Sequence, residues 1–309
     1  MERDQIFQGA PRQGRQGIYP GKSRAHVGGP PLVPDAEKVK WTMENALPKG
    51  NVPSIIKAAQ ILDVVASANN AISLAELTES VKLPKSSVLA ICSSLSRSRL
   101  LKRLENGSYR LGTHVLDLAY AYLSNLSLTQ EFTSVLDTSN EAPGEGIVLA
   151  VLDGADIVHV VCRNGTDMVG VTYRIGARLP ANCTATGKAI LSTFTDEEVQ
   201  ALYQQFPMSQ LTSKSHKDLA TLLKDLHGVR LRGYAVDEEE SHDGLYCVGA
   251  PVYDVSSGHA VAAVAISSLV RPTRIHQHPA IGPVLELSAA LSRRLGAAPR
   301  VQPFLRTGR

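Results

Sequence analysis

Residues 237–247, DEEESHDGLYC, gather acidic, imidazole and thiol side chains in one short stretch. They could form a metal cage, or a hydrolase site with Cys247 as nucleophile and His242 as general base. Consecutive carboxylates in an extended segment point to alternate faces, however, and the sequence offers no second ligand motif to complete such a site. We therefore expect a solvated turn or the rim of a ligand pocket, with no metal and no cofactor.

Residues 184–189, TATGKA, invite comparison with a phosphate-binding loop. That motif requires Gly at position 182 and Ser or Thr at 189, where this sequence has Asn182 and Ala189, so we reject it. Residues 183–187 are expected at the start of a helix, where free backbone N–H groups could hold a small carboxylate. An ordinary helix cap is the alternative.

The four cysteines, at 92, 162, 183 and 247, lie far apart and form no C-x-x-C pair, and the sequence begins with no apolar secretory leader. We expect reduced thiols in a cytoplasmic protein with no membrane-spanning segment. His159 and Cys162 are three residues apart in an expected strand, so they should project to opposite faces and be poor co-ligands.

Residues 83–103, LPKSSVLAICSSLSRSRLLKR, predict a helix with one apolar stripe (Val88, Ile91, Cys92 and Leu95). The opposite side is small, rich in hydroxyl groups and basic at its end. Such a side could be a solvated helix face, or it could meet a phosphate backbone, and the neighbouring elements must decide between the two.

Those neighbours indicate a winged helix-turn-helix over residues 51–112. Helical periodicity begins at Pro53, and Ser73 with Glu76 forms a capping box for a second short helix. After the basic helix, two short strands flank Asn106-Gly107, which suits a type I′ turn. Residues 1–110 carry 16 Lys+Arg and 9 Asp+Glu, against 16 and 20 in residues 111–309. This context favours DNA contact by the basic helix.

The rest of the chain divides into a linking helix over 113–142, a second domain over 143–298 and a tail over 299–309. The linking helix is apolar enough that we expect it to pack against a second copy. Strands IVLAVL, IVHVVC, MVGVTY, YAVDE, LYCVGAPVYD and HAVAAVAISSL, with helices between and after them, predict an α+β sensor-like domain with an antiparallel sheet. Residues 1–50 are expected to be disordered. The alternative is that translation begins at Met43, so that the first 42 residues are not part of the protein.

These motifs together resemble the IclR-type transcriptional regulators over about residues 53–296. The resemblance rests on SIIKAAQILDVV, LPKSSVLAICSSL and GSYRLG in the front part, and on IVLAVLDG, LPANCTATGKAIL and RGYAVDEEESHDGLYCVGAPVYD in the rear part. It implies a DNA-binding domain, a linking helix that pairs subunits and a GAF-like effector domain, assembled as a dimer or tetramer.

Carried over by position, the resemblance implies two sets of residues. The DNA-binding set is Lys85, Ser86, Ser87, Ala90, Ser93, Arg97, Lys102, Arg103 and Arg110. The effector-binding set is Met168, Ala185, Thr186, Asp237, Leu245, Cys247, Ala265 and Ser267. The sequence departs from the family at Leu89 and Ala90, at Arg99, where a glycine is common, and at Ala265, where a serine is common. The last change leaves room for a more apolar or aromatic carboxylate.

We interpret the sequence as a ligand-responsive repressor that binds a double-stranded DNA operator and responds to a small carboxylate or aromatic metabolite, and not as an enzyme. One alternative is a small-molecule enzyme that uses Cys247 as nucleophile. Another is an interaction module whose winged domain contacts proteins.

Overall fold

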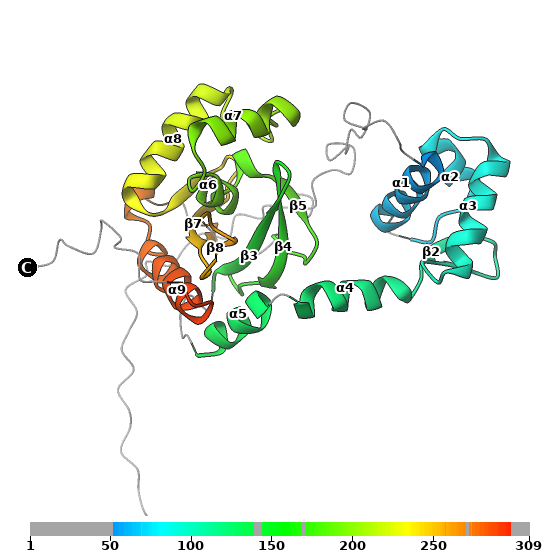
Figure 1. The fold of residues 1–309 in the computed structure, drawn as a ribbon, viewed down its shortest axis with the longest axis horizontal. Helices are drawn as coiled ribbons and strands as arrows, with labels where there is room; N and C mark the ends of the chain where they lie inside the picture. The colour runs from blue at the N-terminus through cyan, green and yellow to red at the C-terminus, as the bar shows by residue number, and fades with distance from the viewer. Residues whose placement is uncertain are drawn as a thin grey trace, which may run out of the picture.

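The computed structural model describes residues 52–297 except 69, 126, 139–143, 169–170, 257, 270–271 and 273. Figure 1 shows a small helical domain, a helical connection and a larger domain built on a sheet. The α+β class with a helix-turn-helix in front is therefore confirmed. The expectations for residues 1–50 and 299–309 lie outside the described residues.

The N-terminal domain has three helices and a two-stranded hairpin: α1 (Pro53–Ser67), α2 (Leu74–Val81), α3 (Lys85–Arg97), β1 (Leu101–Arg103) and β2 (Tyr109–Leu111). Pro53 stands in the first turn of α1, where its missing N–H costs nothing. The capping box of Ser73 and Glu76 opens α2 as expected. One apolar core joins all five elements, through the buried side chains Ile61, Val65, Leu77, Val88, Cys92, Leu95, Leu101 and Tyr109.

The turn of the hairpin differs from the expected type I′. Gly107 has φ +83, whereas Asn106 is not in the left-handed region. The Gly107 N–H donates to the Leu104 carbonyl at 3.0 Å, and the Leu104 N–H donates to the Ser108 carbonyl at 2.8 Å. This is a three-residue loop closed by a glycine bulge. The Asn106 side chain instead accepts a bond from the Ser108 N–H, which satisfies the turn locally.

The connection between the domains is two helices, α4 (His114–Asn125) and α5 (Ser127–Thr138), and not the single helix expected over 113–142. Only α5 joins the second domain's core, because its residues Leu128, Phe132, Val135 and Leu136 are buried there. The described side chains of α4 lie largely exposed between the domains (Figure 1).

A six-stranded antiparallel sheet of order β5-β4-β3-β8-β7-β6 forms the second domain. Its strands are β3 (Gly146–Asp153), β4 (Asp156–Arg163), β5 (Arg178–Pro180), β6 (Ala235–Glu238), β7 (Tyr246–Val252) and β8 (Ala262–Ser268). One face packs against α5 and α9 (Ile281–Arg294). The other is covered by α6 (Ala185–Leu191), with α7 (Asp196–Gln205) and α8 (Leu219–Arg232) beyond it.

Two expectations about this sheet were wrong. The described residues of MVGVTY, Met168 and 171–173, belong to no strand. In addition, a bulge shifts the β3–β4 register, so that Cys162 lies opposite Val148 and His159 opposite Ala150. Because Val148 and Ala150 are two residues apart on β3, His159 and Cys162 share one face of the sheet.

Candidate functional site

The proposed DNA-binding helix α3 packs against the domain core with one side and exposes the opposite side to solvent. Val88, Cys92 and Leu95 are buried in the domain core. The side chains named from the sequence on this helix lie on the opposite surface: Lys85, Ser86, Ala90, Ser93 and Arg97 are exposed, and Ser87 is partly exposed. The structure therefore places this set on one accessible helix face.

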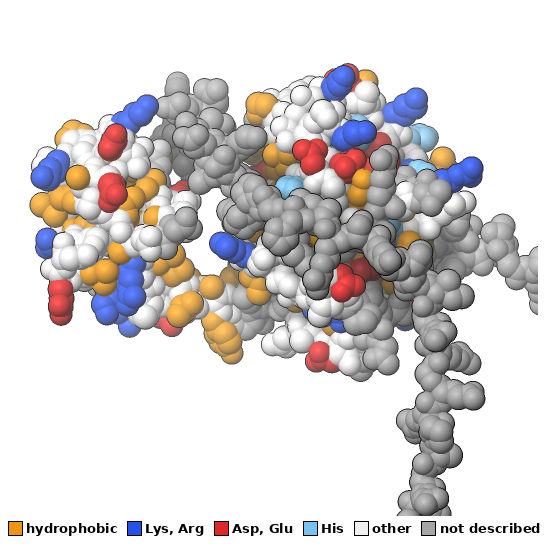
Figure 2. Space-filling model, turned by 180° about the vertical axis from the view of Figure 1, so that it is seen from behind, with side chains coloured by type: hydrophobic (Ala, Val, Ile, Leu, Met, Phe, Trp, Pro, Cys, Tyr) orange, Lys and Arg blue, Asp and Glu red, His pale blue; other side chains and the backbone are white. Residues whose placement is uncertain are grey.

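The hairpin adds cations beside that face. Lys102 and Arg110 are direct cross-strand partners, and both are exposed, as is Arg103. Like charges opposite each other destabilise a hairpin unless an anion lies between them. Among the ion pairs of the described residues, none involves these three cations, Lys85 or Arg97. Figure 2 shows Lys and Arg side chains spaced over this domain.

Leu89 also lies on this surface, with 40% of its side chain exposed. An apolar side chain beside Ala90 offers a contact for a thymine methyl group, which hydroxyl groups do not. The sequence signal was present, since Leu89 stands outside the apolar stripe of the helix. Arg99, just after the helix, has φ +61, which explains in physical terms why glycine suits this position.

In the second domain, the predicted effector residues converge on the sheet face beneath α6. Asp237, Cys247 and Ser267 are cross-strand partners in one row, which continues to Gly146 on β3. Ala265 lies in a neighbouring row, opposite Gly249 and Val148. Side chains paired in this way point to the same face of a sheet.

Apolar side chains close around these rows in one cluster: Val148, Met168, Val171, Ala185, Leu245, Cys247 and Ala265, with Cys162, Tyr173 and Leu269 packed against them. Five of the eight predicted effector residues belong to this cluster. Ala185 and Thr186 border the same cluster from the start of α6. They can do so because Gly249 on β7 has no side chain, so that the α6 backbone packs directly against this strand. A Cβ at position 249 would lie 2.7 Å from the Ala185 carbonyl carbon and 3.1 Å from the Thr186 nitrogen.

The Asp237 carboxylate is already bonded at the edge of this cluster. It accepts the N–H of Glu240 at 2.7 Å, the N–H of Ser241 at 3.2 Å and the Ser241 hydroxyl at 2.5 Å. Burial raises the pKa of Asp237, against the effect of these bonds. The carboxylate thus shapes the 237–241 turn, and its position in the cross-strand row borders the apolar cluster.

The Cys247 thiol lies beside Asp237, Ser267 and Tyr173, and burial raises its pKa well above the ordinary range. A thiol that stays protonated is a poor nucleophile. The His242 ring interacts with the Asp243 carbonyl at 2.7 Å. This environment does not activate Cys247 in the way that the enzyme alternative requires.

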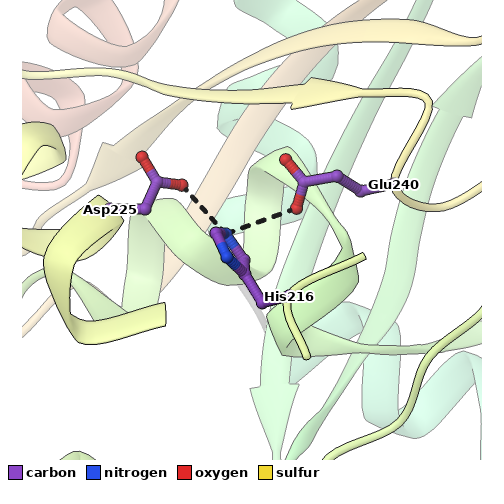
Figure 3. Close-up of side chains that lie close together, drawn as sticks. All are labelled: His216, Asp225 and Glu240. Carbon is purple, nitrogen blue, oxygen red and sulfur yellow. Dashed lines mark hydrogen bonds and ion pairs between the residues drawn. The ribbon is translucent and has the colours of Figure 1, made fainter. Parts of the chain in front are cut away.

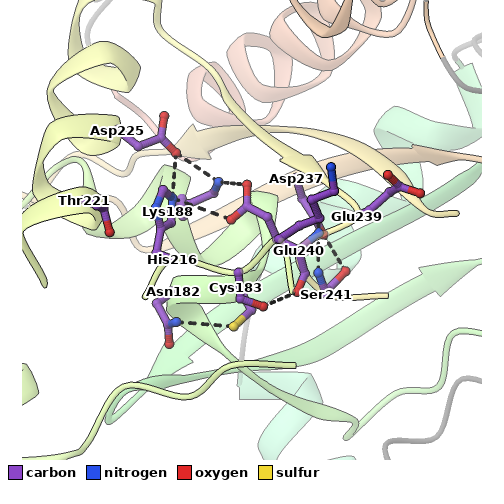
Figure 4. Close-up of polar contacts among 12 residues, drawn as sticks. Asn182, Cys183, Lys188, His216, Thr221, Asp225, Asp237, Glu239, Glu240 and Ser241 are labelled. Atoms are coloured by element: carbon purple, nitrogen blue, oxygen red, sulfur yellow. Dashed lines mark hydrogen bonds and ion pairs between the residues drawn. The ribbon is translucent and has the colours of Figure 1, made fainter. Parts of the chain in front are cut away.

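A second polar cluster, the Lys188 cluster, joins α6, α8 and the 237–241 turn. It consists of Lys188, His216, Asp225, Arg232 and Glu240. The Lys188 ammonium is fully buried and lies 2.5 Å from Glu240 Oε1 and 2.9 Å from Asp225 Oδ2. Arg232 Nη2 contacts the other Asp225 oxygen at 3.0 Å. Figure 4 shows the contacts of Lys188 with Asp225 and Glu240. Lys188 lies within TATGKA, and sequence reasoning did not assign it a role.

Within this cluster, His216, Asp225 and Glu240 place three potential metal ligands within 4.8 Å of one another (Figure 3). Lys188 already supplies a cation to both carboxylates at hydrogen-bond distance, so the trio is best understood as part of an ion-pair network. Burial alone would raise the pKa of Asp225. Bonds from His216, Lys188 and Arg232 outweigh this effect and hold the pKa of Asp225 well below its usual range. Burial raises the pKa of Glu240 to about 7.

Two hollows in the described part of the chain lie elsewhere. One of about 280 Å³ lies between the β3 end and α7, and one of about 250 Å³ lies near Arg230 and Tyr253. Neither is lined by a predicted effector residue. No helix of the described ranges has the length and apolarity needed to cross a bilayer.

Comparisons with known proteins agree with this organisation. Residues 54–105 match the IclR helix-turn-helix domain, and residues 120–293 match the C-terminal domain of the bacterial transcriptional regulator IclR. The chain is 29% identical over 224 residues to the acetate operon repressor of Salmonella typhimurium, which covers 71% of this chain and 80% of that protein. It is 27% identical over 220 residues to the transcriptional regulator XynR of Escherichia coli, covering 71% and 86%.

Solved structures give the same result. The repressor BlcR of Agrobacterium tumefaciens is 35% identical, with a TM-score of 0.51, over 81% of this chain and 99% of that chain. An IclR homologue of Microbacterium hydrocarbonoxydans, complexed with 4-hydroxybenzoate, shares the fold with a TM-score of 0.68 at 18% identity, over 79% and 100%. With both domains matched in order, the chain belongs to the IclR family of bacterial transcriptional regulators.

Proposed function

We propose that this protein is a cytoplasmic, ligand-responsive repressor whose winged helix-turn-helix binds an operator and whose second domain binds a small effector. The observation that carries the proposal is the surface of α3 and the hairpin, where five cations have no ion-pair partner among the described residues and two of them face each other across β1 and β2. A phosphate backbone would supply the missing counter-charge.

On this proposal, Ser86, Ser87, Ala90 and Ser93 approach base edges in the major groove, with Leu89 beside them. Lys85, Arg97, Lys102, Arg103 and Arg110 contact phosphates. Small side chains at the centre of the helix let its backbone approach the groove floor, and the cations fix its position along the duplex.

We also propose that two copies associate through α4. Leu116, Leu118, Tyr120 and Tyr122 expose between 53% and 76% of their side chains on this short helix. Figure 2 shows hydrophobic side chains along the segment between the domains. A second α4 packed there would remove this apolar surface from water and would place two winged domains to read a palindromic operator.

The effector is proposed to bind at the cluster under α6, in contact with the eight residues assigned from the family. Apolar walls with a few polar groups at one end suit a small carboxylate or an aromatic metabolite. The solved relative that holds 4-hydroxybenzoate supports an aromatic ligand for this fold. A coupling of about 1–3 kcal/mol between effector and operator would change occupancy by up to about a hundredfold.

Fluorescence anisotropy tests the proposal. The full-length protein is titrated on its own upstream intergenic DNA and on scrambled DNA at several salt concentrations. We expect tighter binding to the intergenic DNA and a steep loss of affinity with salt. Lys102→Ala with Arg110→Ala should reduce the slope of log affinity against log salt by about two per bound protomer, and so by about four for a dimer, since each phosphate contact contributes about one.

The matched control changes two exposed lysines of the second domain, Lys214→Ala with Lys217→Ala, and should leave the slope unchanged. Equal, weak binding of both DNAs at every salt, with and without candidate effectors, would contradict the proposal. It would then favour the interaction-module alternative.

A further inference from the structure

Tyr173 lies in the segment that the sequence predicted as a strand and that the structure leaves irregular. Its ring packs against the apolar cluster under α6 and meets the His159 ring edge-on, with 5.6 Å between centroids. It also lies directly over Gly146, where a Cβ would come within 2.6 Å of its Cε2 atom and 3.5 Å of Met168 Cε. Gly146 therefore provides the space that the ring occupies.

The hydroxyl of Tyr173 lies among the predicted effector residues. It interacts with Ser267 and Cys247, the two central members of the cross-strand row, and with the charge of Asp237. Yet the oxygen is fully shielded from water and has no hydrogen bond of acceptable geometry among the described residues. A buried hydroxyl without a partner costs about 1–3 kcal/mol, which the rest of the fold must offset.

Tyr173 as a whole residue is partly exposed, although its hydroxyl oxygen is buried. Tyr173 thus enters the pocket from the surface with its polar end innermost. Its backbone is held by the side chain of Asn164, which accepts the Tyr173 N–H at 2.7 Å and donates to its carbonyl at 3.3 Å. Two side-chain bonds at an exposed position hold a segment less firmly than a strand ladder does.

We propose that the Tyr173 side chain fills the effector pocket and that the effector is a small phenol, whose ring and hydroxyl replace those of Tyr173. The inference rests on the proposed function of this domain and narrows its ligand class. The pocket already accommodates one phenol ring, lined by aliphatic side chains, with a hydroxyl directed at Ser267 and Cys247. A ligand of the same shape reuses these contacts once Tyr173 turns outward.

Calorimetry on the full-length protein tests this, with phenol and p-cresol as probes and benzoate and pyruvate as comparisons. Tyr173→Ala should bind phenol about tenfold or more tightly than the wild type does, because no ring has to be displaced. Tyr173→Phe keeps the ring and removes the unsatisfied oxygen, so it should bind phenol several-fold more weakly than the wild type. Weaker or unchanged phenol binding by Tyr173→Ala would overturn the proposal, as would preferential binding of pyruvate.

A control variant distinguishes phenol bound in the effector pocket from phenol bound in a cavity that a Tyr→Ala substitution creates. Tyr203 also has a buried hydroxyl without a partner, but it packs in a different core. Phenol should change the operator affinity of Tyr173→Ala at an about tenfold lower concentration than that of the wild type, whereas Tyr203→Ala, which keeps Tyr173, should respond at the wild-type concentration. Phenol binding to Tyr173→Ala without an effect on DNA would overturn the proposal.

A wrong ligand class and a wrong assignment as a regulator would give different experimental results. If Tyr173→Ala does not fold, which its thermal unfolding would reveal, the opposite prediction for Tyr173→Phe still decides the inference. If no variant binds the intergenic DNA even without phenol, the proposed regulator is wrong. The calorimetric comparison would still show whether Tyr173 and phenol compete for one volume.

Discussion

Two buried clusters border the same helix, α6, and they differ in whether their polar groups face an opposite charge. In the Lys188 cluster, every charged group faces an opposite charge within 4.0 Å, although the buried Glu240 Oε2 atom has no hydrogen bond among the described residues. In the pocket around Tyr173, two polar atoms, the Tyr173 hydroxyl and His159 Nδ1, are shielded from water and lack a hydrogen bond. The ion pairs of the first cluster oppose rearrangement, whereas on our proposal the second cluster holds a hydroxyl without a hydrogen bond that a ligand displaces.

This difference in charge pairing indicates that the two clusters have different roles in the domain. Lys188 joins α6 to α8 and to the 237–241 turn, and so holds two walls of the pocket in place. The pocket itself is lined mainly by apolar side chains and keeps its few polar atoms at one end. We infer that Lys188 is structural and that the pocket is the element that responds to ligand.

The largest effect is expected from Lys188→Met, which would remove the nearest cation from the buried Glu240 and leave Asp225 paired, among the described residues, only with Arg232 and His216. The free energy of unfolding should fall by about 3–5 kcal/mol, as measured by urea denaturation. Adding Asp225→Asn and Glu240→Gln should recover part of this loss, because the buried charges are then removed together. A loss below about 1 kcal/mol, similar to that of the exposed control Lys217→Met, would contradict a structural role.

A somewhat smaller effect concerns His159 in the pocket. Burial lowers its pKa to about 4, from about 6.5 in an unfolded chain. Between these values the unfolded state binds more protons, so stability is lost as the pH falls from about 6.5 to 4, by at most about 3 kcal/mol. His159→Phe should remove this part of the pH dependence of unfolding, whereas His227→Phe, at an exposed position, should leave it in place.

The Ser215 hydroxyl has hydrogen-bond partners, whereas the Tyr173 hydroxyl has none among the described residues. Ser215 accepts the N–H groups of Leu211 and Thr212 and donates to the Glu240 carbonyl at 2.7 Å. Ser215→Ala should therefore cost about 1–3 kcal/mol, whereas Tyr173→Phe should stabilise the protein by about 1 kcal/mol. Thermal unfolding of the two variants shows whether the first loses stability and the second gains it. A loss of stability in Tyr173→Phe would show that the hydroxyl is satisfied after all.

The smallest effect on the fold is expected from Cys247→Ala. The change removes one sulfur atom from the pocket floor, so the affinity for phenol should fall while the operator affinity without ligand changes less than about twofold. Anisotropy and calorimetry on the same preparation measure both. Turnover of any small substrate by the wild type that Cys247→Ala abolishes would support the enzyme alternative instead.

Local chemistry made much of the fold predictable from the sequence. The capping box of Ser73 and Glu76 opens a helix because both groups are within one turn of chain. The exposed side of α3 follows from the 3.6-residue period that buries Val88, Cys92 and Leu95. The turn at Asn106-Gly107 was placed correctly but assigned the wrong type, since several hairpin loops accept glycine there and strand register selects among them.

The sequence by itself therefore determined the helices and most strands of the described chain, the basic face of the front domain and the resemblance that identifies the family. Only the tertiary structure decided that His159 and Cys162 share a face, that Lys188 neutralises Asp225 and Glu240, and that Tyr173 lies over Gly146. The physical reason is distance along the chain. Periods and caps depend on neighbours within a few residues, whereas a bulge, a buried ion pair or a filled pocket depends on groups that meet only when the sheet and its helices pack.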